Sequence, residues 1–322
     1  MSTEVAQHSP GIMHVFGAPA LSEAALGWWL TVISCAVVAI VTIVLIAALV
    51  RKRDAEEGGD EAHRRKPVAA LSWIYVGVSI TVVILIGSFI GTMVTLAHAS
   101  RPSTRSPLTL DVTGHQWWWE VRYSDSLASD GFVTANEVHI PVGVPVRLRL
   151  HGADVIHSWW IPELAGKTDL IPGQVNEAWF EARTPGEYHG QCAEYCGMEH
   201  AKMAAIVFAD PPARYEQWAA QQRAAASAPA DSAAKSGEFV FVRSCGACHA
   251  VRGSGAEGRV GPDLTHLASR TTIAAGTLEN TEGNLLGWIG DPQIVKPGAL
   301  MPKVALSGRD AAAVVAYLRT LK

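Results

Sequence analysis

Gln191–Met203 reads QCAEYCGMEHAKM, and this stretch decides the character of the central part of the chain. It holds two cysteines four residues apart, Cys192 and Cys196. His200 follows after four more residues, and Met203 three residues later. Thiolate, imidazole and thioether together are the ligand set that copper selects. A local disulfide with a chance histidine and methionine is the alternative, and the surroundings of the stretch must decide between the two.

The residues around this stretch alternate in short apolar and polar runs. In VPVRLRLHG, Val146, Leu148 and Leu150 share one face of a predicted strand, while Arg147 and Arg149 share the other. Turn residues separate the runs, and many short strands between turns favour an all-β sandwich. The predicted strands lie in LTLDVTGHQWWWEVRY, EVHIPVGVPVRLRLHG, QVNEAWFEAR and MAAIVFAD.

Two uncharged apolar runs precede the β region, at residues 27–50 and 68–97. Each exceeds the roughly 20 apolar residues that cross a hydrocarbon core as a helix, so both are predicted membrane spans. The loop 51–67 between them carries six basic residues, whereas residues 1–26 contain no Lys or Arg. The loop is therefore expected in the cytoplasm, with the segment 1–26 and everything after the second span outside it.

The last part of the chain, 237–322, follows an Ala/Pro/Ser-rich stretch that reads as a linker at 219–236. SCGACHAV contains Cys245, Cys248 and His249 in the C-x-x-C-H spacing of covalent c-type haem attachment. The two thiols would bond the porphyrin edge, and the imidazole would bind the iron. A zinc knuckle would need more Cys or His ligands nearby, and a redox C-x-x-C would need a βαβ pattern that the sequence lacks.

A second axial ligand for the haem iron is offered by Met301 in PGALMPK, the only methionine after Met203. A thioether opposite an imidazole raises the reduction potential, which suits an electron carrier. Ser307 and Asp310 then form a capping-box pattern before an apolar stripe, so the chain is expected to end in a helix.

The copper hypothesis requires one more imidazole. If each sulfur of the pair bridges two copper ions, the ions share one unpaired electron and each needs a terminal ligand. His157 in GADVIHSWWIPEL is the strongest candidate, because it lies between two predicted strands. His151 is the alternative, and His189 reads as a structural or neighbouring residue.

CAEYCGMEHAKM, DVIHSWWIPELAGKTD and GHQWWWEVRY together resemble subunit II of haem–copper cytochrome c oxidases, and the haem motif resembles the fused caa3-type branch. The resemblance covers nearly the whole chain. It implies a two-helix transmembrane hairpin at 27–98, a cupredoxin-like Greek-key β-barrel at 106–218 and an all-α cytochrome c domain.

The resemblance also implies a binuclear CuA centre, to which it assigns six residues. Cys192 and Cys196 would bridge the two copper ions, His157 and His200 would be terminal ligands, and Met203 would be a weak axial ligand. Glu194 would offer its carbonyl opposite, and its carboxylate would reach a magnesium ion at the boundary with subunit I.

In this family electrons reach CuA at a tryptophan, which the resemblance places at Trp117. They would arrive from the c-type haem and continue to haem in subunit I, where dioxygen is reduced to water with proton translocation. Trp118 and Trp119 read as core or membrane-interface residues. The tethered haem domain is the expected donor to CuA, with the linker raising its effective concentration.

The expected partners follow from this reading: oxidase subunit I and other oxidase subunits, a cytochrome c or upstream respiratory complex, and membrane lipid. The location would be a bacterial plasma membrane, with both metal domains on the periplasmic side. A net charge of −4 argues against nucleic acid. Asp125, Asp130 and Asp154 are candidates for recruiting a separate cytochrome, although solvated surface is the ordinary explanation of each.

Two other classes of protein also use such ligands. A CuA subunit of a nitric oxide reductase would differ only in its partner, while a nitrous oxide reductase would need a histidine-rich propeller that this chain lacks. A copper-delivery chaperone predicts a βαβ pattern without covalent haem. One departure from the family is the missing glutamate near the start of the second span, where PVAALSWIY stands. Either Glu61 or a residue of another subunit would replace it, or the proton path would open differently.

Overall fold

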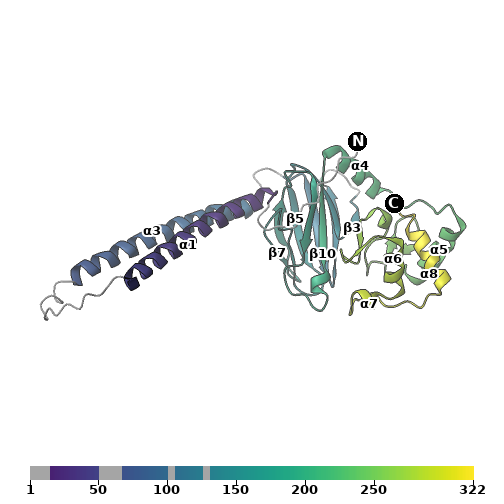
Figure 1. Cartoon of the computed structure of the whole chain (residues 1–322). Helices are drawn as coiled ribbons and strands as arrows, with labels where there is room; N and C mark the ends of the chain where they lie inside the picture. The colour runs from purple at the N-terminus through teal and green to yellow at the C-terminus, as the bar shows by residue number, and fades with distance from the viewer. Residues whose placement is uncertain (1–14, 51–66, 101–105, 126–130) are drawn as a thin grey trace. The chain divides into compact units, whose positions relative to one another are not determined.

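The computed structural model describes residues 15–50, 67–100, 106–125 and 131–322 (Figure 1). The chain forms two compact units: Ser22–Ser100, and a larger one that joins Met1–Leu21 to Arg101–Lys322. Most of the predicted outer segment 1–26, the loop 51–66 and Glu61 lie outside the described residues.

The smaller unit contains α3 (Pro67–Ser100) and all but the first turn of α1 (Ala18–Val50). They lie side by side in Figure 1, and a Cβ added to Gly91 of α3 would lie 3.6 Å from Leu26 Cδ1 of α1. Both are long and apolar enough to cross a membrane, and their apolar side chains stay exposed. Hydroxyl groups within them, such as those of Thr31 and Thr81, donate to the carbonyl four residues earlier. The two predicted spans are thus confirmed as apolar helices suited to membrane anchoring.

The β domain consists of two main sheets with a buried core between them. One sheet has the order β3-β2-β1-β5-β8, with β1 parallel to β5 and the other pairs antiparallel; the second has the order β4-β10-β9. Strands β6 and β7 form a separate two-stranded sheet, and β6 begins with His157. The bounds are β1 Leu108–His115, β2 Trp118–Asp125, β3 Val133–Ala135, β4 Glu137–Pro141, β5 Val146–Gly152, β6 His157–Trp159, β7 Thr168–Leu170, β8 Asn176–Phe180, β9 Gly186–Gln191 and β10 Ala204–Asp210.

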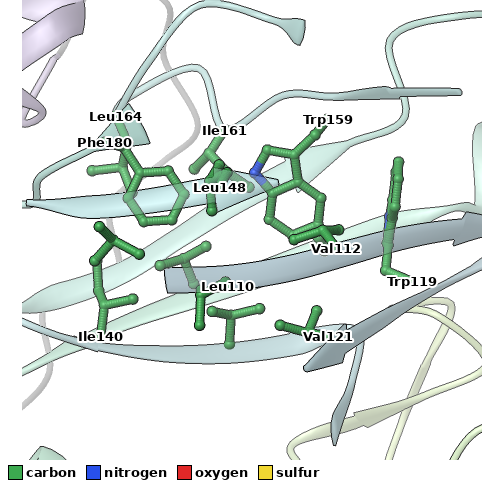
Figure 2. Packing of buried hydrophobic residues seen from close by; sticks show 14 of the residues in the cluster. Leu110, Val112, Trp119, Val121, Ile140, Leu148, Trp159, Ile161, Leu164 and Phe180 are labelled. Carbon is green, nitrogen blue, oxygen red and sulfur yellow. The ribbon is translucent and has the colours of Figure 1, made fainter. Parts of the chain in front are cut away.

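Alternation along the strands produces this core. Val146, Leu148 and Leu150 of β5 are buried while Arg147 and Arg149 between them are exposed, as the sequence pattern predicts. Figure 2 shows the inner faces meeting, with side chains such as Leu110, Trp159 and Phe180 in one cluster. The predicted all-β layer is therefore confirmed.

The strand prediction was wrong at one point. Within LTLDVTGHQWWWEVRY, Gln116 and Trp117 form the turn of a hairpin of β1 and β2 and do not belong to a strand. Trp117 therefore lies in the turn and not on a strand face, whereas Trp119 is fully buried in the core. Trp118 stacks on His115 at a ring separation of 4.4 Å.

The C-terminal part is helical. Helix α4 (Pro212–Arg223) follows the last strand, and α5 (Ser232–Ser244), α6 (Glu282–Gly290), α7 (Pro292–Val295) and α8 (Gly308–Leu318) follow it. Four two-residue strands also occur: β11 Ala250–Val251, β12 Ala256–Glu257, β13 Thr272–Ile273 and β14 Leu278–Glu279. Two short 3₁₀-helices also occur: η1 (His200–Lys202), between β9 and β10, and η2 (Leu267–Ser269), between β12 and β13. Helix α5 begins inside the stretch that reads as a linker.

Helices α5 and α8 cross closely and bury the core of this part. A Cβ at Gly237 of α5 would lie only 1.9 Å from the carbonyl oxygen of Ala313 of α8, so the crossing requires glycine there. Ser307 Oγ accepts a hydrogen bond from the Asp310 amide at 3.1 Å, which confirms the predicted cap of α8.

Candidate metal centres

Four side chains of the quoted loop and one from β6 gather around two sulfur atoms. Cys192 Sγ lies 3.7 Å from Cys196 Sγ and 3.9 Å from His157 Nδ1. Cys196 Sγ lies 3.6 Å from His200 Nδ1 and 3.8 Å from Met203 Sδ. The cysteines are free thiols, well beyond the roughly 2.05 Å of a disulfide bond. The structure therefore brings every predicted side-chain ligand to one place.

Backbone hydrogen bonds shape the loop. The Cys192 amide donates to the Met203 carbonyl at 2.9 Å, which closes the loop where β9 ends and β10 begins. The Ala193 amide donates to Ser158 of β6 at 3.0 Å and ties the loop to the strand that holds His157. Gly197 has a φ of 119°, and a Cβ there would lie 3.0 Å from the Trp117 ring. A glycine is therefore required at this position.

His157 is held in one orientation by Asp154. Its Nε2 lies 2.8 Å from Asp154 Oδ1, while its Nδ1 faces Cys192. Asp154 is itself fixed by the amides of Gln116 and Val155, both at 2.7 Å. Burial lowers the pKa of His157, but hydrogen bonds with Cys192 and Asp154 outweigh burial and raise that pKa. A carboxylate behind an imidazole is the arrangement that orients metal-binding histidines.

The two sulfurs are coupled by the hydrogen bond between them. This bond lowers the pKa of Cys192 to about 3 and raises the pKa of Cys196. Cations placed between the sulfurs would stabilise both as thiolates, so this buried donor set fits copper.

Two other histidines of the β domain pair with carboxylates outside this cluster, while Glu194 contacts it only through its carbonyl oxygen. His151 Nε2 pairs with Asp111 at 3.3 Å, and His189 Nε2 pairs with Glu187 at 3.2 Å. The carbonyl oxygen of Glu194 lies 3.3 Å from Cys192 Sγ, while its carboxylate points away and lies 3.6 Å from Lys167 Nζ.

Trp117 is hydrogen-bonded directly to the sulfur loop, residues 191–203. Its indole Nε1 donates to the Cys196 carbonyl at 3.0 Å, and the Gln116 side chain donates to the same oxygen at 2.7 Å. The Trp117 side chain is buried rather than open to a separate protein, because the loop around Gly298 lies beside it.

The haem-motif residues line a cavity. Cys245, Cys248, His249 and Met301 all face it, together with apolar core residues such as Phe241 and Leu264. His249 Nδ1 lies 2.9 Å from the Pro262 carbonyl, which leaves Nε2 for a ligand. Gln293 Nε2 donates a hydrogen bond to the Met301 carbonyl oxygen at 3.1 Å, and this bond fixes the loop that carries Met301.

His115 of the β domain also lines this cavity, and its Nε2 is buried without a hydrogen-bond partner among the described residues. Burial lowers the pKa of His115, so the ring is mainly neutral. A polar group of a large apolar cofactor would satisfy this nitrogen. The cavity and its donors therefore fit a haem.

Sequence reasoning missed three residues. Asp154 was read as a possible docking acid but orients His157, and its place three residues before that histidine was the available signal. Gln116 donates a hydrogen bond to the sulfur loop from a turn that the sequence pattern predicts as part of a strand. Lys296 is buried against this loop from a distant part of the chain, and no local pattern marks it.

Comparisons with known proteins agree with these features. A family described as cytochrome c oxidase subunit II, periplasmic domain, matches residues 108–209, and one described as cytochrome c matches residues 234–322. A cytochrome c oxidase subunit 2 of Alkalihalophilus pseudofirmus is 36% identical over 299 residues, covering 91% of this chain and 85% of the relative. One of Bacillus sp. PS3 is 34% identical over 238 residues, covering 70% of this chain and 65% of the relative.

Among solved structures, the periplasmic domain of subunit II of cytochrome oxidase of Bradyrhizobium japonicum is 31% identical. The match covers 37% of this chain and 96% of that one, with a TM-score of 0.35.

Two apolar helices, a β domain with a sulfur–imidazole cluster and a helical domain with a c-type haem motif place the chain among membrane-anchored electron-transfer proteins. It belongs to the cytochrome c oxidase subunit 2 family, in a form that carries a cytochrome c domain. The resemblance seen in the sequence and the predicted fold class are confirmed.

Proposed function

We propose that this chain is the subunit through which electrons enter a respiratory cytochrome c oxidase. Electrons would pass from c-type haem to binuclear CuA and on to haem in subunit I, for dioxygen reduction to water coupled to proton translocation. The buried sulfur–imidazole cluster on a chain that also holds a haem motif is the observation that carries this proposal. The dioxygen site would belong to a partner subunit.

The ligand roles are part of the proposal. Cys192 and Cys196 would bridge the two coppers, His157 and His200 would be terminal ligands, and Met203 would be an axial ligand. The Glu194 carbonyl is the opposite weak ligand, which its 3.3 Å distance to Cys192 Sγ supports. When bound, copper shared by two sulfurs accepts and releases an electron with little change in geometry. The chain's own part is to hold both thiolates and the imidazoles in place and to exclude water.

The haem assignments are argued in the same way. Cys245 and Cys248 would attach the haem, while His249 and Met301 would bind its iron; their common position around one cavity supports this. Trp117 is the electron entrance to CuA, and its hydrogen bond to the Cys196 carbonyl supports that role. The exposed Glu194 carboxylate would bind magnesium at the boundary with subunit I, in competition with Lys167.

The proposed location is a bacterial plasma membrane, with CuA and haem on the periplasmic side and the loop 51–67 in the cytoplasm. Subunit I, other oxidase subunits and membrane lipid are the proposed partners, and a cytochrome c or upstream respiratory complex is the donor to the haem. We retain the division into a CuA domain at 106–218, a linker at 219–236 and a haem domain at 237–322 as part of this proposal.

The test is a metal and haem analysis of the full chain, purified from its native membrane with its partners. We expect two coppers that share one unpaired electron, seen as EPR hyperfine structure, and one covalent haem. Cys192→Ser should abolish the shared-spin signal and keep the haem. Cys35→Ser on α1 is the matched control, because Cys35 is a free, exposed cysteine far from the site in sequence.

A Cys192–Cys196 disulfide without copper in this preparation would refute the copper site. Oxygen and nitric oxide consumption by the same complex distinguishes an oxidase from a nitric oxide reductase. Nitric oxide reduction without oxygen uptake would replace the proposed reaction while leaving the metal ligands intact.

A further inference from the structure

One buried lysine joins the haem domain to the loop that holds the candidate copper ligands. Lys296 follows α7, and its residue is only 3% exposed. Its ammonium donates to the carbonyl oxygens of Trp117 at 2.8 Å, Lys202 at 2.8 Å and Ala274 at 3.3 Å. An ammonium has three N–H donors, so all of them are used.

The acceptors of Lys296 lie beside both candidate sites. Trp117 bonds the Cys196 carbonyl through its indole, and Lys202 lies between His200 and Met203. Lys296 itself lies five residues before Met301, on the segment that leads to this haem-iron candidate. A single side chain thus ties the Met301 segment to two segments that frame the sulfur cluster.

A second buried charge makes an independent contact between the same two domains. Glu137 of β4 is 4% exposed and accepts four hydrogen bonds from the haem domain. The donors are the amide and hydroxyl of Thr271, at 3.0 and 2.8 Å, and those of Thr272, at 2.7 and 2.9 Å. A carboxylate without these donors would be costly to bury.

Two further hydrogen bonds join the same two domains. Ala204 of β10 donates its amide to the Ala275 carbonyl at 3.1 Å, and the Lys202 ammonium donates to the Val295 carbonyl at 2.6 Å. A domain held only by a flexible linker has no reason to bury a lysine and a glutamate against its neighbour. Both charges are buried here only because the other domain supplies their partners.

We propose that Lys296 is a positioning residue that docks the haem domain permanently on the CuA loop and fixes the separation between the two redox centres. The inference rests on the proposed function and specifies how the haem domain donates its electron. The haem domain stays bound to the CuA domain during electron transfer and does not move to and from it on the linker. Glu137 is the second anchor of the same surface.

The experiment uses the purified full complex with two variants and one control. Lys296→Met keeps the length of the side chain and removes its donors, and Glu137→Gln keeps the shape and removes the charge. Lys303→Met is the matched control, because Lys303 follows Met301, is exposed and pairs with Asp291 inside the haem domain at 2.8 Å.

Two measurements are made on each protein. One is the rate at which a single electron moves from photoreduced haem to oxidised copper, together with the reduction potential of each centre. The other is hydrogen exchange at the amides of Ala204 and Thr272, which donate across the docked surface. Exchange requires neither activity nor a loaded site.

We expect Lys296→Met to slow electron transfer by about tenfold or more and to accelerate exchange at both amides, since a buried hydrogen-bonded charge is lost. Haem content, copper content and both potentials should stay unchanged. Glu137→Gln should act in the same direction, and Lys303→Met should match the unaltered protein.

Wild-type rates and wild-type exchange in Lys296→Met would overturn the inference. If that variant loses haem or copper, Glu137→Gln decides, because Glu137 lies outside both sets of candidate ligands; an unchanged rate and exchange there overturn it equally. If the unaltered chain itself lacks copper or haem, the proposed function fails, while exchange in the two variants still tests the docking on its own.

Discussion

The two candidate metal sites of this chain are built in opposite ways. At the copper site, side chains from one loop and one strand touch each other, with sulfur and nitrogen atoms 3.6 to 3.9 Å apart. At the candidate haem site, Cys245, His249 and Met301 line a cavity. The chain's own hydrogen bonds fix the first site, whereas the cofactor has to complete the second.

This contrast teaches which domain depends on its cofactor. The β domain has a continuous apolar core that includes both cysteines, so it should fold without copper. The haem domain lines its cavity with apolar residues that also belong to its core, such as Leu264, Leu285 and Val314. Without haem those residues would face an empty space, which a packed interior tolerates poorly.

The largest effect is expected from removing both haem cysteines. Cys245→Ala combined with Cys248→Ala should abolish covalent haem and leave the haem domain without cooperative unfolding, because its core cavity is unfilled. Haem absorbance after denaturation and circular dichroism during heating measure this. The β domain should keep its own transition, and a haem domain that unfolds normally without haem would erase the contrast between the sites.

A smaller effect is expected behind the copper site. Asp154→Asn removes the carboxylate that orients His157 and should weaken copper binding by about 10- to 100-fold while the β domain stays folded. Competition with a copper chelator measures the affinity. Asp169→Asn is the control, since this carboxylate lies on β7 and pairs with Lys167 at 3.9 Å. Equal affinities in the two variants would mean that the loop alone orients the ligands.

Packing around the haem cavity should matter next. Gly237→Ala would place a Cβ 1.9 Å from the Ala313 carbonyl, which should lower the free energy of unfolding of the haem domain by about 1–3 kcal/mol. Denaturant titration followed at the haem absorbance reports it. Gly308→Ala, at a position with no atom within 4 Å of the added Cβ, should be nearly neutral. A neutral Gly237→Ala would show that haem, not the α5–α8 contact, dominates stability.

The smallest effect is expected at the cap of α8. Ser307→Ala removes the acceptor of the Asp310 amide, which should cost about 1 kcal/mol of haem-domain stability. The same titration measures it, and the β-domain transition serves as the internal control. A loss several times larger would mean that fraying at the start of α8 also disrupts the α8 residues that line the cavity.

Much of the fold was predictable because its signals are local. Uncharged runs marked α1 and α3, alternation marked β5, and the Ser307–Asp310 pair marked the start of α8. Each depends on residues within one or two turns or along one strand. The hairpin at Gln116 and Trp117 was missed because the tryptophans continue the apolar pattern through the turn, and the pairing of β1 with β2 breaks it.

The candidate sites divide in the same way. The spacing of Cys192, Cys196, His200 and Met203, and that of Cys245, Cys248 and His249, indicated most of the candidate ligands from the sequence alone. A metal or a porphyrin edge demands such fixed spacing within a short loop. His157 was identified as a candidate ligand from its position between two predicted strands and from the family resemblance. The fold places its Nδ1 beside Cys192.

What the sequence determined by itself was therefore the chemistry: two anchoring helices, a sulfur–imidazole set and a haem motif on one chain. Only the tertiary structure decided how the parts meet. Glu137 and Lys296, which lie between the two domains, have partners 134 and 179 residues away. Such contacts leave no local pattern, since a buried charge is recognisable only when folding brings its partners to it.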